Sequence, residues 1–189
     1  MPQNKHLKKV LELLRLFEGG AILAAIDTET TGLNPATDRL LEVGAVRFSK
    51  DGVIDTFNQL INPGCSIPYN ATRINHITED MVQDCPTEKE ILPDLVKFVS
   101  NSILVAHNAN FDLKFINTAL VRCGHKSLSN RVEDTVKISR SIFPSLESHR
   151  LQFLAQHFNI DPGNAHRAQD DARVCMELLL ICLQQVSEG

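Results

Sequence analysis

The chain has 189 residues, of which 43% are hydrophobic, and a formal net charge of −4. This size suits one domain with a single core, and no apolar window is long enough to cross a membrane. The acidic balance argues against a protein that binds nucleic acid by bulk electrostatics alone. The first ten residues lack the apolar stretch of a signal peptide, so we expect a cytoplasmic protein.

The cysteines and aromatic residues do not indicate a site. The five cysteines are odd in number and form no C-x-x-C pair, which excludes a zinc knuckle and a disulfide framework as working interpretations. We expect them to be reduced and mostly packed. The nine Phe, single Tyr and absent Trp argue against a broad base-stacking platform. Phe48, Phe115 and Phe153 lie at periodic apolar positions and are expected in the core.

The first third of the chain predicts one helix and three strands. Apolar residues recur at helical spacing over 5–18, before Gly19-Gly20, which predicts an amphipathic helix. Three strand-like runs follow at 22–29, 40–49 and 53–61, joined by turn-rich stretches. Because no helix separates them, they are expected to form an antiparallel meander.

After residue 62 the pattern changes to alternating helices and strands. A capping box of Thr87 and Glu90 opens one of the predicted helices. The elements expected here are helices over 78–84, 88–100, 110–122, 136–142, 150–158 and 167–185, and strands over 103–107 and 131–135. A meander followed by βαβ units predicts an α/β fold with one mixed five-stranded sheet, flanked by helices.

Two carboxylates stand where a buried strand ends. Asp27 and Glu29 are separated by two positions, so their side chains leave the same face of the strand, about 7 Å apart at the backbone. Two like charges held this close repel each other unless a cation lies between them. The pair therefore points to a metal site more strongly than either acid would alone.

Further acids follow two other predicted elements. Asp112 lies in the first turn of the helix after "VAHNANFD", and Asp170 and Asp171 lie in the first turns of the helix after His166. Each acid alone is explained by the helix dipole, and the histidine alone by a surface or capping role. Together with Asp27 and Glu29 they supply hard oxygen ligands, which suit Mg²⁺ or Mn²⁺ rather than Zn²⁺. Two such ions about 4 Å apart would support phosphodiester hydrolysis.

These segments resemble the DnaQ-like 3′-to-5′ exonucleases of the DEDDh type, which have a ribonuclease H-like fold. "DTETTGL" (27–33) is similar to the first exonuclease motif, "HNANFD" (107–112) to the second and "HRAQDDA" (166–172) to the third. The similarity extends over about residues 22–185. One motif would be weak, whereas three in order make an accidental match implausible.

The resemblance assigns roles to five residues. Asp27, Glu29, Asp112 and Asp171 would hold two divalent cations, and His166 would be the general base that deprotonates the attacking water. Asp171 is chosen over Asp170 by the family's five-residue step from histidine to aspartate. A histidine base implies that activity is lost below about pH 6.

The resemblance also implies contacts with the terminal nucleotide. Backbone around Thr30 would meet the 3′-hydroxyl, and Leu33 would wedge against the last base or, in the alternative, be a packed turn residue. His107 would touch substrate or lock the strand end by hydrogen bonds, and we favour the second role. The chain departs from the family at Asn75-His76, where a His-Gly pair is frequent, so no substrate contact is transferred to either residue.

The resemblance is greatest to proofreading epsilon subunits of bacterial replicative polymerases. It implies a DNA 3′ end as substrate, with RNA open because ribonuclease T and oligoribonuclease share these motifs, and a polymerase as a possible partner. Residues 1–20 are expected to be a helix of the same domain as the exonuclease region, 21–189. In a different interpretation, that helix docks the chain into a polymerase assembly with minor catalysis. The tail by which epsilon subunits bind the polymerase is expected to be absent after Gly189.

Overall fold

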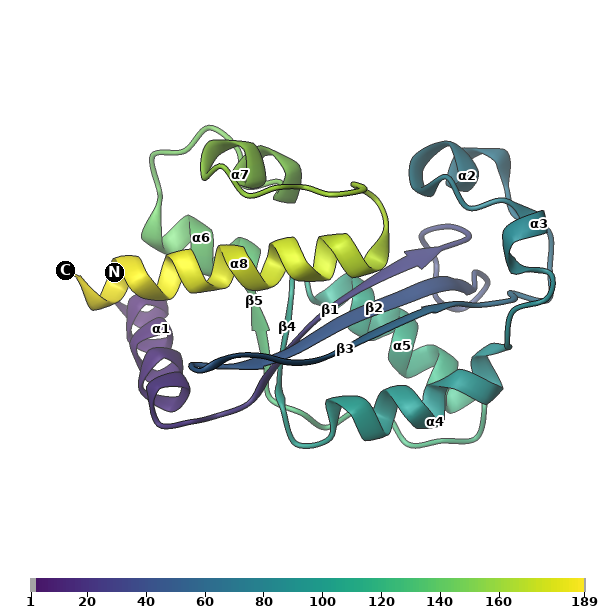
Figure 1. Ribbon diagram of the computed structural model, residues 1–189, viewed down its shortest axis with the longest axis horizontal. Coiled ribbons are helices and arrows are strands. Elements are labelled where there is room, and N and C mark those ends of the chain that lie inside the picture. The colour runs from purple at the N-terminus through teal and green to yellow at the C-terminus, as the bar shows by residue number, and fades with distance from the viewer. Residues whose placement is uncertain (1–2, 189) are drawn as a thin grey trace.

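A five-stranded sheet forms the centre of the molecule in the computed structural model, which describes residues 3–188. The strand order is β3-β2-β1-β4-β5, with β1, β2 and β3 antiparallel and β4 and β5 parallel to β1. The strands are β1 (Leu23–Thr30), β2 (Leu40–Ser49), β3 (Gly52–Leu60), β4 (Ile103–Ala106) and β5 (Val132–Asp134). The predicted α/β fold with a mixed sheet is confirmed (Figure 1).

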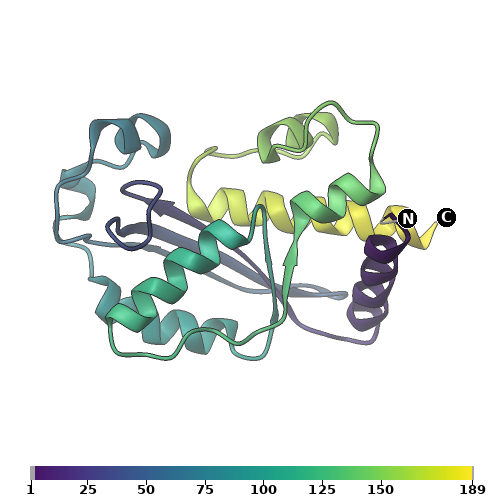
Figure 2. The same cartoon turned by 180° about the vertical axis from the view of Figure 1, so that it is seen from behind.

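Helices cover both faces of this sheet (Figures 1 and 2). They are α1 (Gln3–Glu18), α2 (Tyr69–Asn75), α3 (Glu79–Val82), α4 (Glu88–Val99), α5 (Asn110–Arg122), α6 (Thr135–Ile142), α7 (Leu151–His157) and α8 (Ala168–Ser187). All but α2 match a predicted helix to within a few residues. Only Ala71 and Asn75 of α2 are buried, so this short helix has no periodic apolar stripe that could have revealed it.

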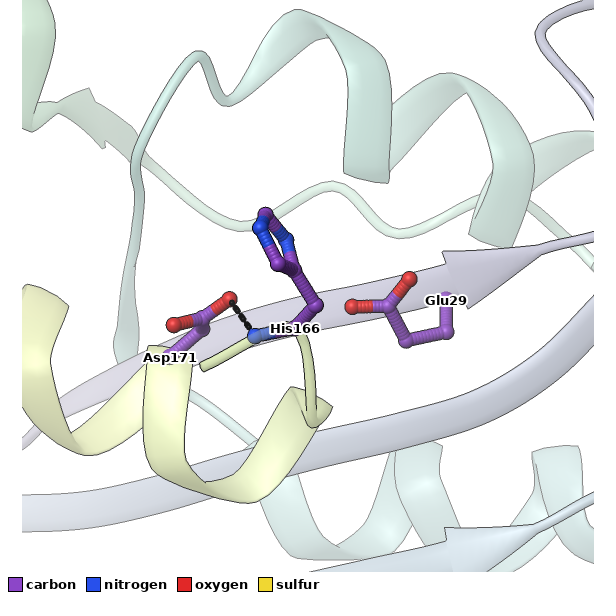
Figure 3. Close-up of side chains that lie close together, drawn as sticks. All are labelled: Glu29, His166 and Asp171. Atoms are coloured by element: carbon purple, nitrogen blue, oxygen red, sulfur yellow. Dashed lines mark hydrogen bonds between the residues drawn. The ribbon is translucent and has the colours of Figure 1, made fainter. Parts of the chain in front are cut away.

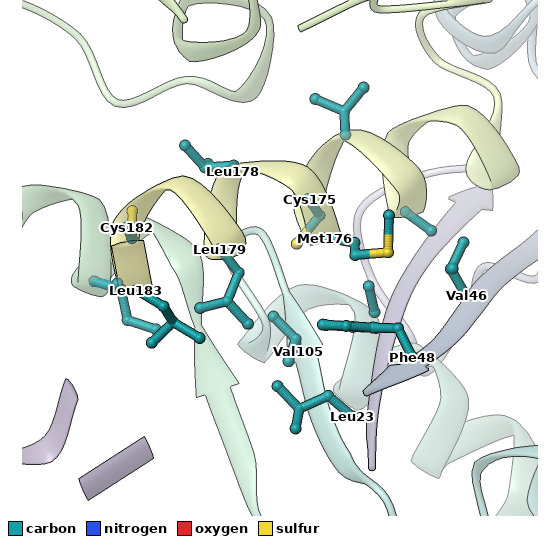
Figure 4. Packing of buried hydrophobic residues seen from close by; sticks show 14 of the residues in the cluster. Leu23, Val46, Phe48, Val105, Cys175, Met176, Leu178, Leu179, Cys182 and Leu183 are labelled. Atoms are coloured by element: carbon teal, nitrogen blue, oxygen red, sulfur yellow. The ribbon is translucent and has the colours of Figure 1, made fainter. Parts of the chain in front are cut away.

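Alternation along β1 divides the core into two layers. Leu23 and Ala25 belong to the layer under α1, α6, α7 and α8, whereas Ala24 and Ile26 belong to the layer under α4 and α5. Figure 4 shows the first layer, in which α8 packs on Leu23 and on residues of β2 and β4. Since side chains alternate along a strand, the odd-numbered positions that follow, Asp27 and Glu29, face α8.

The N-terminal helix packs into the first of these layers. Val10, Leu13 and Phe17 of α1 are buried there, and the Phe17 ring lies 6.1 Å from that of Phe48. Over residues 3–188, no helix combines the length and the apolar character that a membrane crossing requires.

Two sequence expectations about packing need correction. Phe48 and Phe115 are fully buried, as predicted, but Phe153 is only half-buried at the edge of the core. The cysteines are free, and only Cys175 and Cys182, both on α8, are buried. The expectation that most are packed was wrong because the other three lie in a loop, after a short helix and at a helix end, at Cys65, Cys85 and Cys123.

Candidate active site

The first pair of acids lies where β1 extends beyond its parallel neighbour. β4 pairs with β1 only as far as Ala25, whereas β2 accompanies β1 to its end, with Asp27 opposite Gly44 and Glu29 opposite Glu42. The register with β2 shifts between Glu29 and Thr30. Beyond Ala25, therefore, the edge of β1 that faces β4 has no strand to receive its backbone hydrogen bonds.

Asp112 takes the place of the missing strand. Its Oδ1 accepts hydrogen bonds from the backbone N of Thr28 (3.0 Å) and from Thr28 Oγ1 (2.8 Å). Asp112 stands in the first turn of α5 and is 3% exposed, where the positive end of the helix dipole favours a carboxylate. Both hydrogen bonds go to one oxygen, which fixes the orientation of the group and directs Oδ2 elsewhere.

The start of α8 brings Asp171 and His166 to Glu29. His166 has a left-handed backbone (φ 64°), and its N donates to Asp171 Oδ2 at 3.1 Å. Gln152 of α7 donates to Asp171 Oδ1 at 2.8 Å. One ligand atom from each of Glu29, His166 and Asp171 lies within 4.8 Å of the other two (Figure 3). Figure 3 also shows the Glu29 carboxylate directed toward the start of α8.

Asp170 is held away from this group by its own loop. Its Oδ2 accepts hydrogen bonds from the backbone N of Asn164 (2.9 Å) and from the Asn164 side chain (3.3 Å). Asp171, the residue chosen through the family's spacing, is the one beside Glu29.

The four carboxylates, here called the acidic cluster (Asp27, Glu29, Asp112 and Asp171), repel one another. Burial raises the pKa of Asp27 well above its ordinary value, and the charges of Asp112, Glu29 and Asp171 raise it further. Burial, followed by the charge of Asp171, raises the pKa of Glu29 to about 8. Burial also raises the pKa of Asp112 to about 7 and that of Asp171. A buried group of acids with these pKa values is stabilised by positive charge.

The composition of the acidic cluster fits a hard divalent cation. No Lys or Arg within residues 3–188 forms an ion pair with any of its carboxylates, so the charge that the cluster favours is not supplied by a described side chain. Carboxylate oxygens are the ligands of Mg²⁺ and Mn²⁺, whereas Zn²⁺ favours thiolates and imidazoles. The four acids are suited to hold such cations, with His166 at the rim.

The residues expected to contact substrate have distinct surroundings. Leu33 is 84% exposed, so its interpretation as a packed turn residue was wrong. It lines a cavity of about 430 Å³ together with Asn108, Phe111 and others. Thr30 is buried, and its hydroxyl donates to the Gly32 carbonyl. The two ring nitrogens of His107 are engaged within the protein, with Thr135 Oγ1 and the His149 carbonyl, both at 2.9 Å.

Several residues that support the acidic cluster were missed from sequence. Thr28 and Gln152 hold Asp112 and Asp171, as described above, and the Asn75 side chain hydrogen-bonds Glu29, which lowers the pKa of that carboxyl. Asn75 is 1% exposed and ends α2. Each contact joins segments far apart in the chain, so neither periodicity nor spacing carried a signal for it. The family departure at Asn75 was the one available indication.

Comparison with known proteins identifies the family. Residues 24–179 match the exonuclease family. The DNA polymerase III subunit epsilon of Treponema pallidum is 49% identical over 82% of this chain and 73% of its own length. The PolC-type DNA polymerase III of Clostridium perfringens is 41% identical over 86% of this chain, which spans only 11% of that longer protein.

A solved structure of exonuclease I has the same fold. It superposes on 89% of this chain with a TM-score of 0.77 at 19% sequence identity, and the match takes up 43% of the exonuclease I chain. The ribonuclease H-like fold expected from the motifs is confirmed by this likeness. With a family match over most of its length, the chain belongs to the exonuclease family, in its DnaQ-like branch, and is a 3′-to-5′ exonuclease.

Proposed function

We propose that this exonuclease removes nucleotides from DNA 3′ ends, single-stranded or mispaired, and releases nucleoside 5′-monophosphates. The observation that carries the proposal is the acidic cluster, in which carboxylates from β1, α5 and α8 meet at the end of one strand without a cationic partner in the described chain. The names of the relatives, subunits or types of DNA polymerase III, support DNA as substrate and a polymerase as partner. Proofreading, repair or turnover of DNA, in the cytoplasm, is the role this implies.

The acidic cluster would hold two divalent cations, Mg²⁺ or Mn²⁺. Bound cations supply an acidified water and positive charge for the departing 3′-oxygen. The chain itself orients the carboxylates through Thr28, Gln152 and Asn75. His166 is exposed beside them, so its imidazole is free to take the proton of the attacking water.

The terminal nucleotide would occupy the cavity of about 430 Å³ next to Leu33. Leu33 offers an exposed apolar side chain for the last base, and backbone around Thr30 would meet the 3′-hydroxyl. Because the ring of His107 is held at both nitrogens, we assign it to support of the strand end. We treat residues 3–20 as part of the same domain because α1 buries its apolar face in the shared core.

A nuclease assay tests the proposal. Single-stranded DNA labelled at its 5′ end, the matching RNA, and a duplex with a mispaired 3′ end are each incubated with Mg²⁺, Mn²⁺ or a chelator, beside an Asp27→Ala control. Stepwise 3′ shortening of DNA that needs both metal and Asp27 is expected. Shortening of RNA alone would replace DNA by RNA as substrate, and no shortening of any substrate would overturn the proposal.

A further inference from the structure

A fifth carboxylate, outside the acidic cluster, lies fully buried next to it. Glu42 of β2 stands directly opposite Glu29 in the sheet and is 0% exposed. Its Oε2 accepts from Arg167 Nε at 2.9 Å, and its Oε1 accepts from Arg167 Nη2 at 2.8 Å. Oε2 also accepts from the backbone N of Ala168, the first residue of α8, at 3.1 Å. Glu42 thus binds both the side chain before α8 and the helix N-terminus.

Stability is a poor explanation for this ion pair. A buried pair gains little over an apolar packing of the same volume, because both charges must leave water. Here the position is also unfavourable electrostatically, since the charge of Glu42 contributes to raising the pKa values of Asp27 and Glu29. The pair is better explained by what it holds in place.

The start of α8 is fitted closely against β2 at this point. A Cβ built on Gly44 would lie 2.2 Å from the carbonyl carbon of Ala168, so the backbones are in direct contact. His166 immediately precedes Arg167, and Asp171 follows it by about one turn of α8. The three hydrogen bonds of Glu42 therefore act on the segment that carries both residues.

We infer that the Glu42–Arg167 pair is a positioning device that fixes His166 and Asp171 relative to Asp27 and Glu29. The inference rests on the proposed function, because it concerns the geometry of that same site. Neither Glu42 nor Arg167 lines the cavity next to Leu33, so the pair acts on the reacting groups rather than on substrate binding.

A second buried pair in the chain provides a matched control. Glu88 is 7% exposed, accepts from Arg122 Nε (3.1 Å) and Nη2 (2.9 Å), and also accepts from the backbone N of Leu40 at 3.0 Å. It therefore has the same chemistry as Glu42, with a bidentate arginine and a backbone donor. Unlike Glu42, it contributes to none of the pKa shifts of the acidic cluster.

The test compares Glu42→Gln and Arg167→Lys with Glu88→Gln in the full chain. We expect kcat on single-stranded DNA to fall at least roughly tenfold in Glu42→Gln, with KM within about threefold of wild type, because small displacements of reacting groups are costly to the chemical step. Glu88→Gln should lower Tm by a similar amount and keep kcat within about twofold. Arg167→Lys keeps every charge but loses the planar fork, so it should fall between wild type and Glu42→Gln.

Mn²⁺ binding, followed by titration calorimetry without substrate, gives a readout independent of turnover. Arg167→Lys leaves the net charge unchanged, so a roughly threefold or greater loss of Mn²⁺ affinity reports displaced ligands. The inference is overturned if Glu42→Gln and Arg167→Lys both match Glu88→Gln in kcat. Should wild type itself shorten no substrate, the proposed function fails, and the Mn²⁺ affinities alone then decide the inference: unchanged affinity in Arg167→Lys overturns it. If Glu42→Gln does not fold, Arg167→Lys carries the comparison.

Discussion

Asp27 shows most directly how a functional residue can oppose folding. Burial and the charges of Asp112, Glu29 and Asp171 raise its pKa, so its ionised form is unfavourable in the metal-free protein. Residues of this kind persist because the site needs them, although neutral substitutes would make the fold more stable.

We therefore expect Asp27→Asn to have opposite effects on stability and activity. In chelator, its free energy of unfolding should rise by about 1 kcal/mol because one of the repelling charges is removed. Activity should fall at least about a hundredfold because a ligand of the cations is lost. Urea unfolding and the nuclease assay measure the two quantities.

Asp51→Asn is the control for this experiment. Asp51 is exposed and pairs with Lys50 on the surface, so its loss should leave both quantities nearly unchanged. A metal-free Asp27→Asn protein less stable than wild type would contradict the electrostatic account.

At the scale of residues, the sequence predicted the acids better than their supports. The spacing of Asp27 and Glu29 was sufficient to suggest a metal site, and the family pattern was needed to choose Asp171 over Asp170. Gln152 and Asn75 could not have been found, because what makes them important is a hydrogen bond to a distant carboxylate. Their own segments carry no pattern of acids or apolar residues that marks them.

Among the elements, the contact between β2 and α8 sets the tightest steric limit. Gly44→Ala would place a methyl group 2.2 Å from Ala168 C and 2.3 Å from Gln169 N, so the start of α8 must move. We expect a loss of about 1–3 kcal/mol in unfolding free energy and a clear loss of kcat, since His166 and Asp171 move with the helix.

Gly20→Ala separates this effect from general destabilisation. Gly20 has a φ of +89° and no atom within 4 Å of an added Cβ, so the substitution should cost about 1 kcal/mol through backbone strain alone. Its kcat should stay at the wild-type value. A Gly44→Ala protein with wild-type kcat would show that the start of α8 tolerates displacement.

The segment between α6 and α7 forms a basic surface beside the second motif. A cavity of about 680 Å³ there is lined by Asn108, Arg140, His149 and Arg150, among others, and both arginines are exposed. Since Asn108 also lines the cavity next to Leu33, the two hollows meet at this residue. The position suits the phosphates of the strand that leads to the 3′ end.

Replacing Arg140 and Arg150 together by Ala should raise KM for single-stranded DNA roughly tenfold and lower the salt dependence of binding by about 0.7 per lost phosphate contact. kcat should change little, because neither side chain lies in the acidic cluster. Lys97→Ala serves as control, since this exposed lysine pairs with Asp94 on α4. Equal KM values for the double variant and the control would exclude this path for the strand.

Elements were predictable where burial imposes a period. The long helices and the strands of the meander follow from apolar spacing, and their bounds were correct to within a few residues. α2 was not predictable, because it buries only Ala71 and Asn75 and begins after Pro68 without a side-chain cap. Its importance is that it ends next to Glu29, a fact of tertiary structure alone.

Taken as a whole, the molecule is an acidic protein proposed to act on a polyanion. Its formal charge of −4 would be offset by the +4 of two divalent cations, so attraction of DNA is expected to depend on the loaded site. The sheet order and the fold class followed from the sequence. That Asp112 and Asp171 approach from opposite faces of the sheet did not, because the sequence does not state on which face a crossover helix packs.

The pH dependence of stability should follow the acidic cluster. The pKa of Glu29 is raised from 4.5 to about 8 and that of Asp112 from 3.8 to about 7. For acids with raised pKa values, the folded state binds more protons than the unfolded state, so their stabilising contribution is present at low pH and is lost as pH rises toward 8. The Tm of metal-free protein should therefore fall between about pH 5.5 and about pH 8.5.

Mg²⁺ should oppose this fall, because the cation binds the folded, ionised cluster. The rise in Tm on adding Mg²⁺ should be larger at about pH 8.5 than at about pH 5.5, as measured by thermal unfolding with and without chelator. Glu29→Gln should flatten the metal-free pH dependence. A Tm that rises with pH in chelator would contradict the assigned directions.

The open edge of β1 beyond Ala25 has a consequence for how the molecule tolerates change. Asp112 reaches β1 from the layer under α5, and Asp171 reaches it from the layer under α8, so the distance between them spans the thickness of the whole sandwich. A cavity or an oversized side chain in either layer, remote from any ligand, alters that thickness. The separation of the two ions thus works as a gauge of core volume, and repacking should impair hydrolysis before it causes unfolding.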